Sequence, residues 1–311
     1  MVKVVVTGGA GFIGSHLAEA LAERGYQVII LDDLSTGRMV NIEGLLLRNK
    51  NVEFVRGSIT DFPLMSNLFR EVHFVFHQAA ISSTPQSVDS PQTCHEVNVT
   101  GTLNVLTAAR DNRVKKVILA SSCAVYGDSP VLPKREDMLP LPLSPYAVTK
   151  LAGEHYSRVF SQVYGIPTVC LRYFNIYGPR QNPDSEYSAV IPKFIKGISQ
   201  VKPITIFGDG NQTRDFAFVK DVVAANILSA ESAACGVFNI GSGEETSINT
   251  LAQLIINLMG NNVTPLYQPP RPGDIVHSFA DISKIKSFGF SPKYTLEEGL
   301  KETLGVQSDE Q

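Results

Sequence analysis

The sequence predicts an α/β protein built on a doubly wound parallel sheet, with a second, smaller α/β lobe. Three observations predict this class. Short β-branched runs alternate with longer helical stretches over the first half of the chain. A glycine-rich turn, Thr7–Gly14, directly follows the first of these runs and opens a helical stretch. After Arg172 the alternation loosens, and proline and glycine become frequent, as is typical of loops over the edge of such a sheet.

Six runs of β-branched and aliphatic residues have the length of buried strands, and helical stretches separate them. The expected strands are residues 2–6, 28–31, 52–55, 74–77, 117–120 and 168–171. The expected helices are about 12–24, 61–70, 95–111 and 146–164, and later about 189–200, 219–230, 247–259 and 296–303. Strands that alternate with helices in this way form a parallel sheet covered on both faces.

The composition indicates an ordinary globular chain. With 311 residues, 43% of them hydrophobic, and a net charge of −3, it can bury a large core and lacks the basic surface that nucleic acid requires. No apolar run approaches the ~20 residues that span a bilayer, and no apolar signal segment precedes the first strand. The four cysteines show neither paired nor metal-type spacing. We therefore expect a soluble cytoplasmic protein with free thiols, no metal site, and no nucleic-acid or membrane partner.

The glycine-rich turn has the context of a dinucleotide-binding site, because a strand precedes it and a helix follows. Gly8 would permit the tight turn, Gly11 would let the backbone approach a pyrophosphate, and Gly14 would let the helix pack on the strand. Asp32 ends the second strand, where a carboxylate accepts hydrogen bonds from ribose hydroxyls and repels a 2'-phosphate. This favours NAD over NADP, although Arg38 follows closely in the sequence. The alternative is a turn whose glycines serve geometry alone.

Tyr146 and Lys150 lie four residues apart in a helix that Ser144 and Pro145 are expected to begin. A free phenol has a pKa of about 10. An ammonium ~4 Å away at an effective dielectric constant near 20 would contribute on the order of 4 kcal/mol, or roughly three pKa units. An oxidised nicotinamide ring would add a second positive charge. The pair is therefore expected to act as a base near neutral pH; the alternative is an ordinary surface pair.

Ser121 and Ser122 directly follow an expected strand, where a hydroxyl can hydrogen-bond the oxygen that Tyr146 deprotonates. A nucleophilic serine is the rival interpretation, but no Gly-x-Ser-x-Gly elbow surrounds these residues. His77 ends another strand and is expected to be a structural hydrogen-bonding residue rather than an acid or base. Cys123 is expected to be a small packed residue.

These elements, in this order, resemble the extended short-chain dehydrogenase/reductase superfamily. Within it the chain is similar to the UDP-hexose 4-epimerases, particularly the branch that acts on N-acetylated UDP-sugars. The resemblance covers nearly the whole chain. The segments that carry it are Thr7–Gly14, His77–Ala80, Asn98–Thr102, Ser121–Gly127, Tyr146–Lys150 and Arg172–Pro179.

The resemblance implies a mechanism. Tyr146 would take the proton from the sugar 4-hydroxyl while C4 gives hydride to NAD, the 4-keto sugar would turn, and hydride would return to its other face. Lys150 would be the partner of Tyr146, and Ser122 would position O4. Relatives that dehydrate sugars carry Asp-Glu where this chain has Cys123-Ala124, and elimination of water needs an acid and a base. Dehydration is therefore not expected.

The resemblance also implies which residues bind the cofactor and which bind the substrate. The expected cofactor contacts are Gly8, Gly11, Phe12, Ile13, Gly14, Asp32, Ser58, Ile59, Ala79, Tyr146 and Lys150. The expected substrate contacts are Ser83, Ser122, Tyr146, Asn175, Ala189, Val190, Phe207, Arg214, Arg271, Asp274 and Ser278. Ser58 is a departure from the family pattern, since an aspartate that contacts the adenine is usual at this position. Arg214 and Arg271 would face the diphosphate, since guanidinium groups suit phosphates.

Ser278 stands where relatives restricted to unacetylated sugars carry a bulky side chain, often tyrosine. A small residue leaves room for an acetamido group at C2, so UDP-GlcNAc and UDP-GalNAc should be accepted, and UDP-glucose and UDP-galactose need not be rejected. Two other readings remain open: a UDP-glucuronate 4-epimerase or decarboxylase, and a non-catalytic dinucleotide-sensing protein.

The same resemblance implies an organisation for the whole chain. Residues 1–173, with about 214–241, are expected to form an NAD-binding Rossmann domain. Residues of about 174–213 and 242–311 would form the nucleotide-sugar-binding lobe. Relatives are commonly homodimers joined through the helices near 95–111 and 146–164, so a homodimer is expected.

Overall fold

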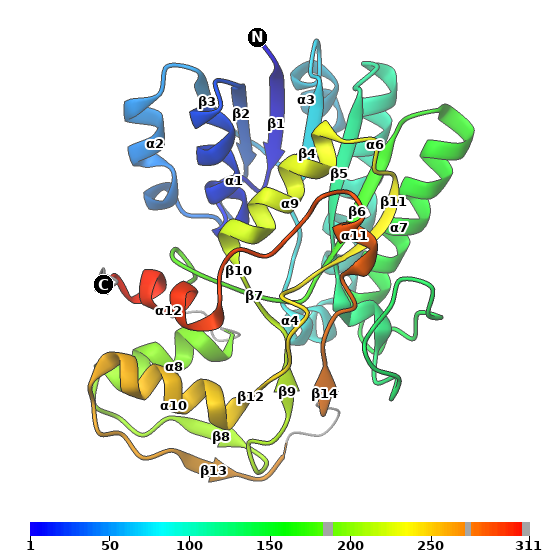
Figure 1. Cartoon of the computed structure of the whole chain (residues 1–311). Helices are drawn as coiled ribbons and strands as arrows, with labels where there is room; N and C mark the ends of the chain where they lie inside the picture. Colours follow the sequence, from blue (N-terminus) through cyan, green and yellow to red (C-terminus); the bar gives the residue numbers. More distant parts are fainter. Residues whose placement is uncertain (183–188, 271–274, 307–311) are drawn as a thin grey trace.

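The computed structural model describes residues 1–182, 189–270 and 275–306. Its centre is a parallel sheet of seven strands in the spatial order β11-β6-β5-β4-β1-β2-β3 (Figure 1). The chain leaves the centre of the sheet in both directions, as in doubly wound folds, so the carboxyl ends of β1 and β4 lie side by side at the switch point. The strands are β1 Lys3–Thr7, β2 Gln27–Asp32, β3 Val52–Arg56, β4 Phe74–His77, β5 Lys116–Ser122, β6 Thr168–Tyr173 and β11 Gly236–Ile240.

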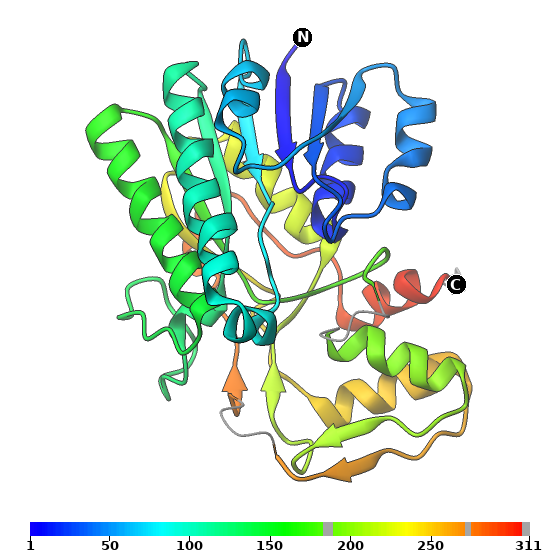
Figure 2. The ribbon, with the colours of Figure 1, turned by 180° about the vertical axis from the view of Figure 1, so that it is seen from behind.

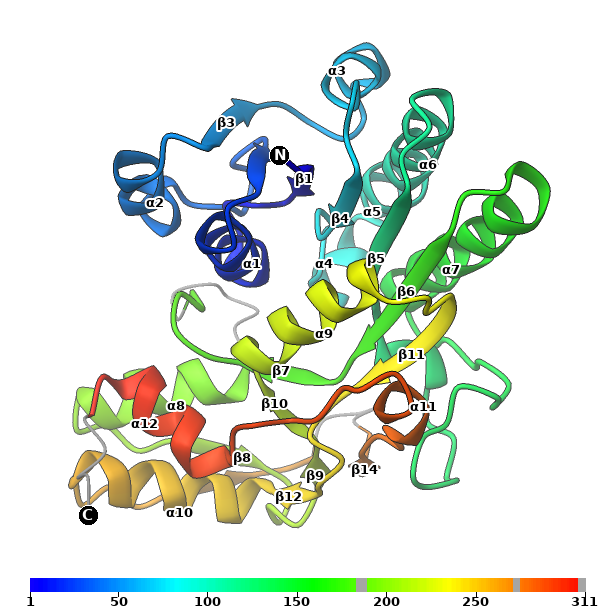
Figure 3. The same ribbon diagram turned by 45° about the horizontal axis from the view of Figure 1, so that its top comes forward.

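Helices cover both faces of this sheet (Figure 3). On one face α1 and α9 pack together over a core that includes Val4, Leu17 and Val222. On the other face α3, α6 and α7 cover a second core that includes Val5, Val105 and Phe160. The helices of this domain are α1 Phe12–Glu23, α2 Glu43–Arg48, α3 Phe62–Leu68, α4 Thr84–Asp89, α5 Pro91–His95, α6 Gly101–Asp111, α7 Pro145–Tyr164, α9 Val219–Glu231 and α11 Ser283–Lys286. Short helical turns occur at Met39–Asn41, Glu96–Thr100 and Cys123–Tyr126.

Local sequence explains where α7 begins and ends. The Ser144 hydroxyl accepts a hydrogen bond from the backbone N–H of Ala147 (3.1 Å), and Pro145 is the first helical residue. Gly165 ends the helix with φ 70°, a left-handed conformation that glycine adopts without strain. Ser144 and Pro145 are the signals that predicted the start of this helix.

A smaller lobe lies below the carboxyl edge of the sheet (Figures 1 and 2). Its helices pack over a third core that includes Phe194, Ile206 and Leu251. The helices are α8 Val190–Ser199, α10 Ile248–Met259 and α12 Leu296–Leu304. Its strands are short and form three small sheets: β7 Asn175–Tyr177 with β10 Phe216–Phe218, β8 Thr205–Phe207 with β13 Leu266–Gln268, and β9 Thr213–Arg214 between β12 Thr246–Ser247 and β14 His277–Ser278.

The predicted fold class is confirmed, and each strand and helix predicted above is present. The seventh strand, β11, was not predicted, and neither were α2, α4, α11 or the small sheets. Within the described ranges, no helix combines the length and the apolar character needed to cross a membrane.

Candidate active site

The glycine-rich turn is as tight as its sequence predicts. Gly8 has φ +67°, and a β-carbon there would lie 2.6 Å from the backbone nitrogen of Ala79. A β-carbon on Gly14 would lie 2.1 Å from the carbonyl oxygen of Gly8, inside any allowed contact. Gly11 precedes α1 without a side-chain cap, so the first N–H groups of this 12-residue helix face outward from the turn. The cradle therefore fits a pyrophosphate.

Gly14→Ala is expected to weaken NAD binding by about five- to a hundredfold, because the new methyl group must displace backbone atoms of the turn at a cost of about 1–3 kcal/mol. Calorimetric NAD titration and the NAD content after purification measure the effect. Gly44→Ala is the matched control: it lies in α2, and its nearest neighbour would be a flexible Arg48 guanidinium at 3.7 Å. Equal NAD affinity in both variants would contradict the role given to the turn.

The other predicted cofactor residues lie along the same edge. Asp32 ends β2 and is 7% exposed; its carboxylate accepts hydrogen bonds from the backbone N–H groups of Ala10 and Leu34, each at 2.9 Å. Burial raises the pKa of Asp32, and these two N–H groups oppose that rise. Ser58 follows β3, and its hydroxyl is 2.9 Å from that of Thr60.

His77 is the centre of a buried chain of hydrogen bonds. The Thr7 hydroxyl lies 2.7 Å from Nδ1 of His77, and the Thr102 hydroxyl lies 2.9 Å from Nε2. Thr102 donates its own proton to the carbonyl of Asn98 (2.6 Å), so it accepts from Nε2–H of His77. Burial lowers the pKa of His77 to about 3. The ring is therefore neutral and structural.

This burial makes the stability of the protein sensitive to acid. The unfolded chain binds a proton at His77 below pH 6.5, whereas the folded protein does so only near pH 3. The contribution of neutral His77 to the free energy of unfolding is therefore complete above pH 6.5. It is lost as the pH falls toward 3, at about 1.4 kcal/mol per pH unit. Between pH 6.5 and 4.5 the free energy of unfolding of the wild type should fall by about 2–3 kcal/mol relative to His77→Gln. Denaturant titrations across this range measure it; parallel pH curves would contradict it.

Tyr146, Lys150 and Ser122 meet at the carboxyl end of β5. Lys150 is 8% exposed and donates from Nζ to the carbonyl of Ala120 (2.9 Å), and the same nitrogen lies 5.8 Å from the centre of the Tyr146 ring. The backbone N–H of Tyr146 donates to the Ser87 hydroxyl (3.0 Å), which ties the start of α7 to α4. The Ser122 hydroxyl accepts from the backbone N–H of Ala124 (3.2 Å) and also lowers the pKa of Tyr146.

The expectation that Lys150 alone brings the phenol near neutrality is wrong for the protein by itself. Burial raises the pKa of Tyr146 to about 12 and lowers the pKa of Lys150 to about 8. Desolvation by burial disfavours the charged form of each group and is the largest cause of both shifts. A positive charge beside the phenol, such as that of an oxidised nicotinamide ring, would lower this pKa.

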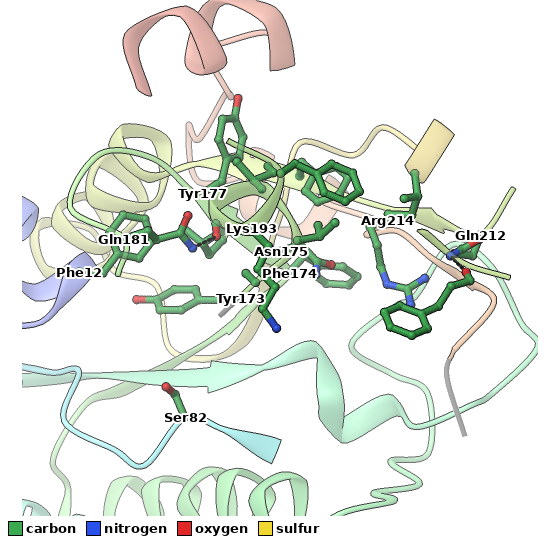
Figure 4. A pocket seen from close by; sticks show the side chains of 18 of the residues that line it. Phe12, Ser82, Tyr173, Phe174, Asn175, Tyr177, Gln181, Lys193, Gln212 and Arg214 are labelled. Carbon is green, nitrogen blue, oxygen red and sulfur yellow. Dashed lines mark hydrogen bonds between the residues drawn. The ribbon is translucent and has the colours of Figure 1, made fainter. Parts of the chain in front are cut away.

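A pocket of about 770 Å³ opens between the end of the sheet and the lobe. In Figure 4, Arg214 and Gln212 lie next to each other on one side of it, and Phe12 and Gln181 lie on the other. The predicted site residues that line this pocket are Phe12, Ile13, Ser122, Tyr146, Asn175, Ala189, Val190, Phe207 and Arg214. Segments from both halves of the chain thus converge on one cavity.

The other predicted substrate residues either do not line this pocket or lie outside the residues that the structure describes. The Ser83 hydroxyl accepts from the backbone N–H of Gln86 (3.1 Å) as the cap of α4, and it is the neighbouring Ser82 that lines the pocket. Ser278 does not line the pocket, but it is 6% exposed and pairs in register with Arg214. Arg271 and Asp274 lie outside the described residues.

Sequence reasoning did not single out several residues that line the pocket. Tyr173 is one: its hydroxyl donates to Oε1 of Gln78 (3.2 Å) and accepts from Nδ2 of Asn226 (2.8 Å), which come from two other parts of the chain. Gln212 lies two residues before Arg214 and could have been found beside it. No sequence signal marks Gln181 or Lys193.

Fold and site together define a dinucleotide-dependent enzyme with a buried tyrosine–lysine pair at the carboxyl edge of its sheet. The chain belongs to the NAD-dependent epimerase/dehydratase family, whose model matches residues 4–241, and its cofactor is NAD.

Solved structures similar to this chain include nucleotide-sugar epimerases over their full length. A UDP-N-acetylglucosamine 4-epimerase from Methanobrevibacter ruminantium, in complex with UDP-N-acetylmuramic acid, has a TM-score of 0.95 and 42% identity, covering 98% of this chain and 97% of that one. A UDP-glucose 4-epimerase from Thermotoga maritima, with UDP-glucose, has a TM-score of 0.93 and 40% identity, covering 98% of each chain. A UDP-glucuronate 4-epimerase of Thermodesulfobacterium geofontis is 36% identical over 310 residues, which is 96% of this chain and 94% of the relative.

Proposed function

We propose that this protein interconverts UDP-hexoses that differ in configuration at C4, acting on UDP-GlcNAc and UDP-GalNAc and also on UDP-glucose and UDP-galactose. One observation carries the proposal: Tyr146 and Ser122 share a pocket with Arg214, so an acid–base group and a phosphate-binding group face the same cavity. The similar UDP-N-acetylglucosamine and UDP-glucose 4-epimerases support it.

NAD would lie along the carboxyl edge of the sheet. The Gly8–Gly14 turn and the N-terminus of α1 would hold its pyrophosphate, and Asp32 would accept from the ribose hydroxyls. Ser58, Ile59 and Ala79 would line the adenosine side. When bound, NAD supplies the acceptor and later the donor of the C4 hydride, and a positive charge beside the phenol.

The chain's own residues would manage the proton. Tyr146 Oη would accept the proton of the sugar 4-hydroxyl and return it after the 4-keto sugar has turned in the pocket. Ser122 would hydrogen-bond the same oxygen and hold it near the phenol. Lys150, anchored on the carbonyl of Ala120, would add positive charge and reach the cofactor ribose.

The lobe would hold the nucleotide. The residues that flank β8 bond to β13: the N–H of Leu266 donates to the carbonyl of Ile204 (2.8 Å), and the N–H of Gly208 donates to the carbonyl of Gln268 (2.8 Å). The alternate residues Thr205 and Phe207 therefore turn their backbone groups away from β13, and both residues line the pocket. Backbone carbonyl and N–H groups of this kind would complement the uracil ring; the Phe207 carbonyl also accepts from Nε2 of Gln212 (2.6 Å). Arg214 would bind the diphosphate. Asn175, Ala189 and Val190 would complete the site, together with Arg271 and Asp274, which are not described.

The pocket favours a neutral sugar over a uronate. From the sheet side it is lined by the uncharged Ser82, Ser122 and Tyr146, whereas its described cationic lining residues, Lys193 and Arg214, belong to lobe elements. A carboxylate at C6, two bonds from the reacting C4, would therefore be desolvated without a counter-charge on the sheet side. This argues against the UDP-glucuronate reading.

The deciding experiment incubates the purified protein separately with UDP-GlcNAc, UDP-GalNAc, UDP-glucose, UDP-galactose and UDP-glucuronate, and follows the anomeric protons by NMR. Formation of the C4 epimer from the first four supports the proposal. Epimerisation of UDP-glucuronate alone would support the uronate reading, and release of carbon dioxide a decarboxylase. Binding of NAD without turnover of any of them would indicate a non-catalytic protein.

We also propose a homodimer joined through α7 and the helices near 95–111. Val148, Tyr156, Val159 and Val163 are exposed and recur at helical spacing along one side of α7. Val159→Asp is expected to convert the dimer to a monomer in light scattering, while Leu47→Asp, exposed on α2, should not. A monomeric wild type would contradict this.

Four free cysteines support a cytoplasmic location.

A further inference from the structure

A fully buried carboxylate, Asp215, stands where the chain passes between the sheet and the lobe. Its side chain is 0% exposed. Oδ1 accepts from the backbone N–H (2.6 Å) and the hydroxyl (2.8 Å) of Ser242, and Oδ2 accepts from the backbone N–H groups of Gly243 (3.0 Å) and Ala280 (3.1 Å). The fit is close: a β-carbon on Gly241 would lie 2.4 Å from Oδ2.

These contacts join four of the described segments that cross between the two parts; the fifth, from α11 to α12, is tied to α9 by Asp221 instead. The segment after β11 carries Ser242 and Gly243, and the segment that returns from β14 carries Ala280. The carbonyl of Asp215 itself accepts from the backbone N–H of Asn175 (3.0 Å), in the segment that leaves β6. Asp215 therefore contacts three crossing segments from its own place in the fourth, between β9 and β10.

The same four segments carry the lobe residues proposed to bind substrate. Arg214 immediately precedes Asp215 and lines the pocket, as does Asn175, which pairs with Phe216. Ser278 lies two residues before Ala280 and pairs in register with Arg214. A shift of the Asp215 carboxylate would therefore move two residues together relative to Tyr146 on α7: Arg214, proposed to bind the diphosphate, and Ser278, expected to leave room for the acetamido group.

We infer that Asp215 is a positioning residue that sets Arg214, Asn175 and Ser278 at their distance from Tyr146 and thereby determines affinity for the nucleotide sugar. The inference rests on the proposed function. In the described part of the chain Asp215 forms no ion pair, so its charge is stabilised by neutral donors alone. Such a burial is costly. An apolar residue could fill the space, but it could not orient four donors from two segments.

The test compares Asp215→Asn with wild-type holoenzyme, because an amide NH₂ group must then face a backbone N–H. Calorimetric titration with UDP is expected to show a rise in Kd of about ten- to a hundredfold, since hydrogen bonds to a buried charge are lost. KM for the UDP-sugar should rise in parallel while kcat and bound NAD change little. A role in stability alone would lower Tm and leave the Kd and KM of the folded fraction unchanged.

Asp221→Asn is the matched control. Asp221 is also buried (4% exposed) and accepts from backbone N–H groups of Lys293 (2.9 Å) and Tyr294 (3.3 Å), but it ties α9 to the C-terminal segment rather than to the pocket. It should lower Tm without raising the Kd for UDP. Equal rises in both variants, or a wild-type Kd in Asp215→Asn, would overturn the inference.

If Asp215→Asn does not fold, Ser242→Ala decides, because it removes one donor and keeps the carboxylate. A smaller rise in the Kd for UDP supports the inference, and an unchanged Kd overturns it. The proposed function fails separately: a wild-type protein that neither binds UDP nor converts any UDP-sugar would remove the proposed activity, and with it the inference. A wild type that binds UDP while the variants bind it equally well would leave the activity standing.

Discussion

Tyr146→Phe is expected to abolish epimerisation while NAD and UDP remain bound. The substitution removes one oxygen, the only group in the proposed mechanism that exchanges a proton with O4. General acid–base catalysis of this kind contributes about 10²–10⁴-fold, so turnover should fall by at least that factor. The ring itself stays, so the packing of α7 against β5 and the position of Lys150 should be preserved. NMR detection of the C4 epimer and calorimetric binding of UDP measure the two halves of the prediction.

Tyr126→Phe is the matched control for the loss of a buried phenol. The Tyr126 hydroxyl donates to Oδ1 of Asn239 (2.6 Å), and Tyr126 does not line the pocket. Its loss should lower the free energy of unfolding by about 1 kcal/mol and leave turnover in place. Near-normal activity in Tyr146→Phe would refute the assignment of the base, and loss of NAD binding in that variant would show that the ring has a structural role instead.

Ser278→Tyr is expected to cost the acetylated substrates far more than the plain ones. Ser278 does not itself line the pocket, but it is buried and pairs in register with Arg214 on β9, which does, so a longer side chain at position 278 would project from the same face of that small sheet as Arg214. A tyrosine there would occupy the volume proposed for the acetamido group. Overpacking costs about 1–3 kcal/mol, which corresponds to about a ten- to hundredfold loss in kcat/KM for UDP-GlcNAc relative to UDP-glucose.

Ser278→Ala separates volume from hydrogen bonding, because it removes the hydroxyl and keeps the space. It should retain both substrates. The measurement is kcat/KM for UDP-GlcNAc and UDP-glucose in the wild type and the two variants, with Tm as a check on folding. Equal losses for both sugars in Ser278→Tyr would remove the argument that this position acts as a size gate.

Much of the fold was predictable because its signals are local. The run Val4–Val6 and the cap at Ser144 determine secondary structure through residues only a few positions away. Both lie in the strand and at the helix start that the sequence predicts. β11 was missed because Gly236–Ile240 contains glycine and asparagine, which are uncommon in strands. It becomes a strand through parallel pairing with β6 and burial of Phe238, both of which are long-range. The two-residue strands of the lobe are likewise set by their partners.

The sequence by itself determined the glycine turn and the spacing of Tyr146 and Lys150, since a helix places residues four apart on one face whatever surrounds it. Only the tertiary structure decided their electrostatics: burial raised the pKa of Tyr146, where the spacing alone suggested a fall. It also joined Asp215 to Ser242 and Ala280, which are distant in the sequence. Desolvation and hydrogen-bond partners depend on which distant segments pack together, and the pattern of neighbouring residues in the sequence does not specify that packing.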